Sequence, residues 1–324
     1  MIRVDRVCQI LADIAPLALA ESWDNVGLLV GDRQRSIRVV MVCLTVTPQV
    51  VEEAIAKRVE LIVTHHPLPF RPLTKITSDT TVGKMLLALI AHGIAVYSAH
   101  TAYDSARGGI NQLWAEGLGL SGIAPLVLAD PTRLHPTGGQ NPAGINTPVA
   151  CQAPAEPIGA GRYGRLPEPL DPESLAQKVA SICRCRSWKL VGGKLAGGSP
   201  TGSANPPGSA NAPVSANAPG SANAPISKVA IACGSGGSFL SAAKGRGCQA
   251  LVTGEASFHD CLEAEASGLA LILVGHYASE RFGMERLSGR LATEFRRIDG
   301  ELEVFSSDAD VDPLRTVAAD DFED

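Results

Sequence analysis

Aromatic residues are scarce in this chain of 324 residues, since Phe, Tyr and Trp together account for 4% of it. Positive charge is not in excess either: 28 Lys and Arg stand against 33 Asp and Glu, for a net charge of −5. No basic patch is evident, so the sequence does not indicate a nucleic-acid-binding surface. The apolar runs are too short or too polar to cross a bilayer. We therefore expect neither nucleic acid nor a membrane as a partner.

The eight cysteines are scattered and include no Cys-x-x-Cys pair. The closest two are Cys183 and Cys185, a spacing that supports neither a zinc knuckle nor a Cys-x-x-Cys redox motif. Cys43 and Cys233 fall inside predicted strands, where cysteine behaves as a small buried apolar residue. This usage is typical of a reducing compartment, so we expect a cytoplasmic protein.

Ala, Gly, Val and Leu are abundant, which favours an α/β fold with helices packed on a parallel sheet. Two parts of the chain repeat one pattern. Each begins with a short apolar run, at 39–43 and at 229–233, followed by a helical stretch. Each continues into a second strand that ends in Val-Thr, and then into a third strand preceded by Gly. We infer two related α/β halves whose strand ends could meet at one central metal site.

A loop-rich middle is expected to join the two halves. We place the first half at 1–125, the connector at 126–228, the second half at 229–307 and an acidic tail at 308–324. Within the connector, Asp171 and Pro172 predict the start of a helix over 171–183. Four Ser-Ala-Asn units at 197–225 have no aliphatic residue at a constant position, so we predict a flexible insertion there.

Side chains that bind metals follow three of the apolar runs. His65 and His66 follow one run, His100 and Asp104 follow the next, and His276 and Glu280 follow a run near the C-terminus. Ligands of open α/β sheets bind beyond the carboxyl ends of the strands. Imidazole and carboxylate together suit a divalent ion such as Zn, Mn, Fe or Ni. We predict that the metal ligands are His65, His66, Asp104, His276 and Glu280.

Each of these residues also has a purely structural interpretation. His65 and His66 could cap a strand through backbone hydrogen bonds, although two ions about 3.5–4 Å apart would give each histidine its own metal. Asp104 could cap the segment that follows it. His100 could ligate a metal or act as an acid beside it, and His259 could relay protons or be an ordinary histidine at a helix start. We take His100 and His259 as the candidate catalytic residues.

Two further segments leave alternatives open. The backbone amides of residues 234–237, which follow a strand and open a helix, could hold a phosphate or form a tight turn. Trp23 could stack on a base or seal the N-terminal helix.

In combination and in order, these motifs resemble the Nif-three family, whose members carry the name GTP cyclohydrolase 1 type 2. The matching segments are 22–28, 64–68, 99–104, 252–255 and 275–280, with further matches at 161–164 and 229–237. The resemblance covers about residues 1–125 and 158–300 of the chain. It implies a cytoplasmic homohexameric ring with a dinuclear site for two divalent metal ions in each chain.

The resemblance implies that Glu280 bridges the ions, that His66 and Asp104 bind one of them, and that His65 and His276 bind the other. The chain departs from the family at Phe258, where the first of two histidines usually stands, and at the repeat insertion. The family name implies a metal-dependent hydrolase of the GTP cyclohydrolase type, with activated water attacking C8 of a nucleotide substrate. The alternative is a non-catalytic metal-binding ring that acts as a protein-interaction or chaperone-like module.

Overall fold

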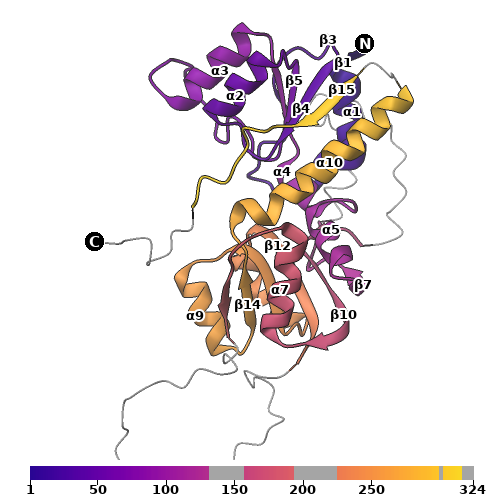
Figure 1. The fold of residues 1–324 in the computed structure, drawn as a ribbon, viewed down its shortest axis with the longest axis vertical. Helices are drawn as coiled ribbons and strands as arrows, with labels where there is room; N and C mark the ends of the chain where they lie inside the picture. Colours follow the sequence, from indigo (N-terminus) through magenta and orange to yellow (C-terminus); the bar gives the residue numbers. More distant parts are fainter. Residues whose placement is uncertain (131–156, 193–224, 299–301, 316–324) are drawn as a thin grey trace, which may run out of the picture.

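Two large sheets covered by helices, with two further sheets of two strands each, form the structure, a computed structural model that describes residues 1–130, 157–192, 225–298 and 302–315 (Figure 1). One large sheet has five strands and the other large sheet has six. The predicted α/β fold class is confirmed, as is the relation between the halves, because each large sheet contains three consecutive parallel strands. The repeat insertion lies outside the described residues except for its last residue, as does the tail beyond residue 315.

The first sheet has the strand order β15–β4–β5–β6–β2. Its parallel centre consists of β4 (Val39–Cys43), β5 (Leu61–Thr64) and β6 (Ala95–Ser98), with β2 (Gly27–Val30) antiparallel at one edge. Alternate residues of each strand face opposite ways. Val40 and Val42 pack in the core with α1 (Val4–Ile14), while Met41 and Cys43 pack with α2 (Pro48–Ala56) and α3 (Thr81–Ala91). Burial on both faces explains why these strands read as unbroken apolar runs.

The second sheet has the order β11–β14–β13–β12–β10–β7. Its parallel strands are β12 (Ile226–Ser235), β13 (Ala250–Glu255) and β14 (Ala270–Leu273), and its antiparallel strands are β7 (Ser121–Ala124), β10 (Arg162–Leu170) and β11 (Lys189–Val191). One face packs in the core with α5 (Ile110–Gly117) and α7 (Pro172–Cys183), and the other with α8 (Leu240–Gly245). α9 (Phe258–Ala266) lies on the same face as α8, and Ala264 is its one buried residue in the core there.

The predicted connector is more than a loop in its described part. β10 pairs with β12 and β11 pairs with β14, so both strands belong to the second sheet. α7 begins after Asp171, as predicted, because the Asp171 side chain accepts hydrogen bonds from the amides of Glu173 and Ser174.

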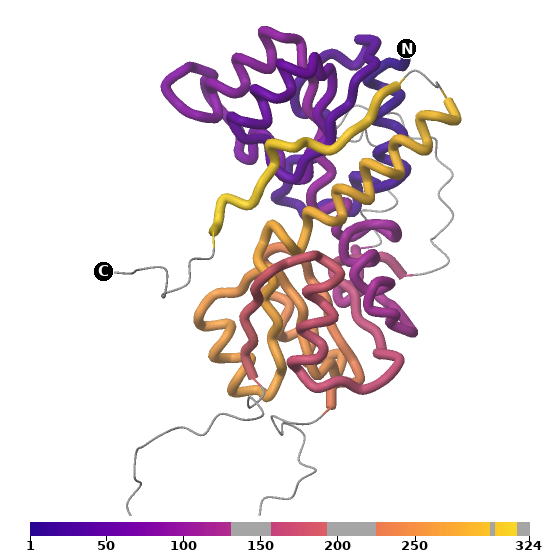
Figure 2. The backbone as a smooth tube through the Cα atoms, viewed as in Figure 1, coloured from indigo at the N-terminus to yellow at the C-terminus, as the bar shows by residue number. Residues whose placement is uncertain are grey.

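Each half also contributes a strand to the other half's sheet. β7 lies within the first 125 residues but pairs with β10 of the second sheet. β15 (Glu303–Ser306) lies within the predicted second half, 229–307, but pairs with β4 of the first sheet. The 23-residue helix α10 (His276–Ile298) packs against strands of both sheets and returns the chain to the first one (Figure 2). The largest core cluster accordingly spans both halves.

The remaining elements are short. They are β1 (Ile2–Arg3), η1 (Leu17–Leu19), β3 (Ser36–Ile37), α4 (His100–Ser105), β8 (Val127–Leu128), β9 (Gly159–Ala160) and η2 (Gly237–Phe239). Within the described parts of the chain, no helix is both long and apolar enough to span a membrane.

Candidate metal centre

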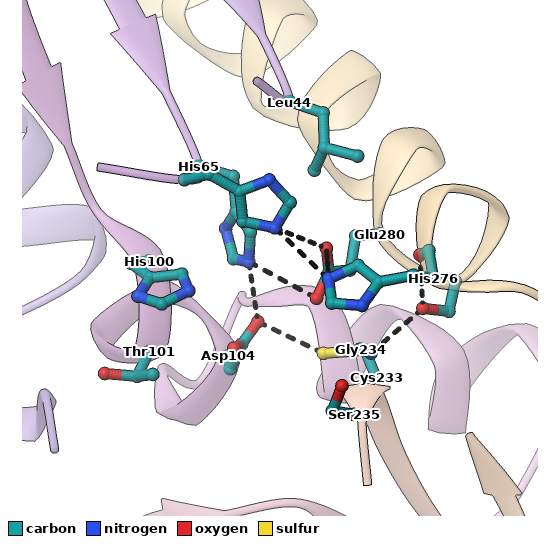
Figure 3. Close-up of polar contacts among 12 residues, drawn as sticks. Leu44, His65, His100, Thr101, Asp104, Cys233, Gly234, Ser235, His276 and Glu280 are labelled. Carbon is teal, nitrogen blue, oxygen red and sulfur yellow. Dashed lines mark hydrogen bonds and ion pairs between the residues drawn. The ribbon is translucent and has the colours of Figure 1, made fainter. Parts of the chain in front are cut away.

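Five predicted ligands converge at the junction between the two sheets. His65 and His66 directly follow β5, Asp104 lies on α4 just beyond β6, and His276 and Glu280 lie in the first turns of α10 after β14. Figure 3 shows the side chains of His65, Asp104, His276 and Glu280 pointing toward one another. The residues that follow these strands therefore meet in the folded chain, although His66 and Glu280 are 214 positions apart in the sequence.

His65, Asp104 and Glu280 form the first group of donors. The His65 Nε2 atom lies 3.6 Å from Asp104 Oδ1 and 3.6 Å from Glu280 Oε1. Donors that bind one ion at 2.0–2.2 Å lie roughly 3–4 Å from each other. The three atoms are therefore spaced as ligands of a single cation would be.

His66, His276 and Glu280 form the second group. Glu280 Oε2 lies 3.1 Å from His66 Nε2 and 3.2 Å from His276 Nε2, and these two nitrogens are 3.3 Å apart. Each oxygen of Glu280 thus faces a different group, as a bridging carboxylate requires.

The donor spacing differs from the pairing that the resemblance implied. His65 and Asp104 lie in one group with Glu280, and His66 and His276 lie in another, while His65 and His66 also form a third group with His100. Adjacent side chains at a strand end point to different sides of the backbone. His65 therefore turns toward α4, which carries Asp104, and His66 turns toward the start of α10.

The ring of His65 provides the test of whether a cation fits here. The residue is 0% exposed, and neither ring nitrogen has a hydrogen-bond partner. A buried polar atom without a partner costs free energy, and coordination of Nε2 would remove that cost. Three imidazoles and two carboxylates form a donor set that suits a divalent first-row ion. The residues present fit a metal site.

The protonation states of the carboxylates follow from their surroundings. Burial acts to raise the pKa of Glu280, but the neighbouring histidines His65, His276 and His66 outweigh it and hold that pKa well below its usual value. Hydrogen bonding to Glu280 is the largest of the effects that raise the pKa of His276 to about 9. Glu280 is therefore anionic and attracts positive charge.

Hydrogen bonds to the Nδ1 atoms orient two of the histidines. His276 Nδ1 donates to Glu255 Oε1 at 2.9 Å, and the Ser235 hydroxyl donates to the same oxygen at 2.5 Å. His66 Nδ1 is hydrogen-bonded to the Thr45 hydroxyl at 2.7 Å. A carboxylate only accepts, so Glu255 places the proton on His276 Nδ1 and turns Nε2 toward the site, whereas the Thr45 hydroxyl can accept from His66 Nδ1 in the tautomer whose Nε2 binds a metal.

His100 is oriented in the same way by Asp24. The Nδ1 atom of His100 lies 2.7 Å from Asp24 Oδ1, and the Asp24 side chain is completely buried. Burial acts to raise the pKa of Asp24, but hydrogen bonds from His100 and Thr101 outweigh it and lower that pKa. His100 has a φ of 26°, an unusual conformation outside glycine, and such strain clusters at functional sites. Its ring centroid lies 5.1 Å from that of His65.

A cavity of about 630 Å³ opens beside the cluster. His66, Asp104, His276 and Glu280 line it together with Trp23, Phe70 and His100. The two aromatic side chains are 61% and 49% exposed, with ring centroids 6.0 Å apart. Trp23 therefore forms part of the cavity wall.

The glycine turn after β12 lets Glu280 approach. A Cβ atom on Gly234 would lie 2.4 Å from Glu280 Oε1, and the residue has a φ of +65°. The amides of Gly234 and Gly236 donate to Ser279 and Thr253 within the protein. These amides thus have protein partners, as expected for a tight turn.

The structure does not bring His259 to this site. The residue is exposed at the start of α9, where its ring contacts Phe258, and it does not line the cavity. Sequence reasoning also missed Asp24, Glu255 and Thr45. The segments 22–28 and 252–255, which carry the family resemblance, contain the first two of these and were the available signal.

Known proteins are similar in sequence to this chain over nearly its whole length. The profile of the Duf34/NIF3 (NGG1p interacting factor 3) family matches residues 2–199 and 209–313. A GTP cyclohydrolase 1 type 2 homolog of Clostridium acetobutylicum is 28% identical, with 97% of this chain and 98% of the relative covered. Protein NIF3 homolog of Schizosaccharomyces pombe is 33% identical, with 92% of each chain covered.

Solved structures share the fold. A Bacillus cereus protein related to NIF3 superposes with a TM-score of 0.76 at 22% identity, with 98% of this chain and 99% of that chain covered. A Staphylococcus aureus protein superposes with a TM-score of 0.74 at 25% identity and the same coverage. Since the family profile matches both halves, this chain belongs to the Duf34/NIF3 (NGG1p interacting factor 3) family.

Proposed function

We propose that this protein is a hydrolase that depends on two divalent metal ions and acts on a nucleotide of the GTP class. The observation that carries the proposal is the position of Glu280, whose two oxygens face two separate groups of donors. The substrate class is supported by the name GTP cyclohydrolase 1 type 2 homolog, which relatives carry. The cytoplasmic homohexamer implied by the resemblance stays part of the proposal.

The chain's own residues would hold both ions. His65 and Asp104 would bind one, His66 and His276 the other, and Glu280 would bridge them. Bound divalent ions would supply Lewis acidity and lower the pKa of water at the site.

His100 is the residue placed to move a proton. Asp24 holds its Nδ1 atom, so Nε2 faces the cavity and can take a proton from an attacking water and return it to the leaving group. The carboxylate partner also stabilises the imidazolium that forms. Trp23 and Phe70 offer aromatic faces on which a planar base can stack.

A non-catalytic role is the second candidate. Phe70, Leu73 and Ile76 are 49%, 43% and 45% exposed along the segment between β5 and α3, and Phe70 lines the cavity. Exposed apolar side chains on one segment are a feature of interaction sites. These exposed residues support the alternative that the protein is a metal-binding module that interacts with partner proteins.

Turnover measurements decide between the two. Protein loaded with one divalent metal would be assayed on GTP, other nucleotides and phosphoesters, then again after chelation and metal restoration. We expect activity that is lost on chelation and restored by the ion. His100→Ala should lower kcat by roughly 100-fold or more with metal content unchanged, whereas the exposed histidine variant His92→Ala should match wild type. Fully metallated protein that turns over none of these substrates would favour the non-catalytic role.

A further inference from the structure

Two residues to which the proposed function assigns no role, Cys233 and Asn111, hold the ligand Asp104. The Cys233 thiol donates to Asp104 Oδ1 at 3.1 Å. The Asn111 side chain donates to the Asp104 carbonyl at 3.2 Å and accepts from the Cys233 backbone amide at 2.8 Å. The three residues therefore form a closed ring of hydrogen bonds.

This ring joins three elements from both halves of the molecule. Asp104 lies on α4, Asn111 on α5 and Cys233 on β12. Asn111 is 3% exposed and Cys233 is half-buried, and both line the wall of the cavity beside Asp104. Figure 3 shows the Asp104 carboxylate between the His65 ring and the Cys233 sulfur. The thiol thus supports the carboxylate from the side away from His65.

We propose that Cys233 is a positioning residue for metal binding, whose thiol holds the Asp104 carboxylate toward His65 while Asn111 fixes the two residues relative to each other. In this arrangement the sulfur is not itself a ligand. The proposal rests on the metal centre of the proposed function and adds a residue that sets its affinity.

The chemistry of the carboxylate explains why such support matters. A free Asp side chain must lose rotational freedom when it binds an ion, and a side chain already held in place avoids that cost. Oδ1 has two lone pairs, so one hydrogen bond from the thiol leaves the other lone pair for a cation. Among the described residues, no group of donors spaced to share an ion includes Cys233.

Cobalt binding to the full-length, metal-free protein tests the proposal. Co²⁺ would be added stepwise and followed by calorimetry and by absorption. We expect wild type to bind two ions, and Cys233→Ala to weaken one of them by about 10–100-fold. Cys233→Ser keeps a hydroxyl donor and should stay within about threefold of wild type. A serine variant as weak as the alanine variant would overturn the proposal.

A double-mutant cycle separates positioning from a general structural effect. In an Asp104→Ala background, Cys233→Ala should change cobalt affinity by less than about twofold, because its effect passes through the carboxylate. A loss of about tenfold or more in that background would contradict the proposal. Cys248→Ala removes another buried cysteine of the second half, 7% exposed, and should leave cobalt binding unchanged.

Absorption spectra separate a positioning residue from a ligand. Cobalt-loaded wild type should show no sulfur-to-cobalt charge-transfer band, because the sulfur contacts the carboxylate and not the ion. A band present in wild type and absent from Cys233→Ala would make Cys233 a ligand and overturn the proposal. Wild type that binds no cobalt would overturn the metal centre as well.

Discussion

One carboxylate connects the whole centre at the scale of single residues. Glu280 is the residue shared by the His65–Asp104 group and the His66–His276 group, and each of its oxygens serves one of them. Asp104 belongs to the first group alone. The two acidic ligands therefore differ in how much of the site depends on them.

Removal of these carboxylates should have unequal effects on metal content. Glu280→Ala takes a donor from both groups and should bring bound metal close to zero. Asp104→Ala weakens one group and should leave the His66–His276 position able to hold its ion. Elemental analysis after reconstitution with a single metal measures both, and Glu285→Ala, on the same helix, serves as control. Equal losses in the two variants would mean that Glu280 does not bridge.

Site residues could be predicted from the sequence where neighbouring residues form a recognisable pattern, and could not be predicted where their role depends on distant residues. His65, His66, His276 and Glu280 follow strands that are buried on both faces, so an unbroken apolar run and the polar residue after it are visible in the sequence. Asp24 and Cys233 act through contacts with residues 76 and 129 positions away. No local pattern reports such a contact. His259 does not line the cavity, and spacing alone does not show which way a helix start faces.

At the scale of elements, the central strands could be predicted and the sheet edges could not. The runs 39–43 and 61–64 coincide with β4 and β5. β15 reaches the first sheet because α10 carries the chain back across the junction, and its position beside β4 depends on pairing between residues far apart in the sequence, such as Glu303 and Val39. α2 fixes the segment after β15 through Glu53, whose carboxylate accepts hydrogen bonds from the Asp308 and Ala309 amides at 3.0 and 3.1 Å.

We predict that the hydrogen bonds accepted by Glu53 stabilise the folded protein at neutral pH and that this stabilisation is lost in acid. Partial burial acts to raise the pKa of Glu53, but hydrogen bonds from Lys57, Ser307 and the two amides outweigh it and lower the pKa from 4.5 to about 2. Because the pKa is lower in the folded state, the stabilisation is complete above pH 4.5 and is lost as the pH falls toward 2. Glu53→Gln should therefore cost roughly 2 kcal/mol at neutral pH and progressively less below pH 4.5.

Urea unfolding of the metal-free proteins across this pH range measures the effect. The comparison is the difference between wild type and Glu53→Gln at each pH, so changes common to both proteins cancel. Glu52→Gln alters the exposed neighbour and should track wild type throughout. A difference that stays constant from neutral pH down to pH 3 would refute the assigned pKa shift, because it would show no titration of Glu53 in that range.

At the scale of the whole molecule, the metal centre lies where the two halves are joined. His65, His66 and Asp104 come from the first half, and His276 and Glu280 come from the second. The halves also exchange β7 and β15, and they share one core cluster. An unfolded chain would not hold ligands from such distant positions at the spacing of one ion. Metal binding should therefore be linked to folding of the entire molecule.

Chelation should accordingly lower the stability of the whole fold. A cation that binds only the folded state stabilises it by RT ln(1 + [L]/Kd), or about 2.7 kcal/mol for each site at 100 times the dissociation constant. We expect the melting temperature to fall on chelation, to recover when the ion returns, and to rise with its concentration. Glu280→Ala loses the bridging ligand and should show almost no such dependence. If that variant gained as much stability from the ion as wild type does, the stabilising ion would be binding elsewhere on the molecule.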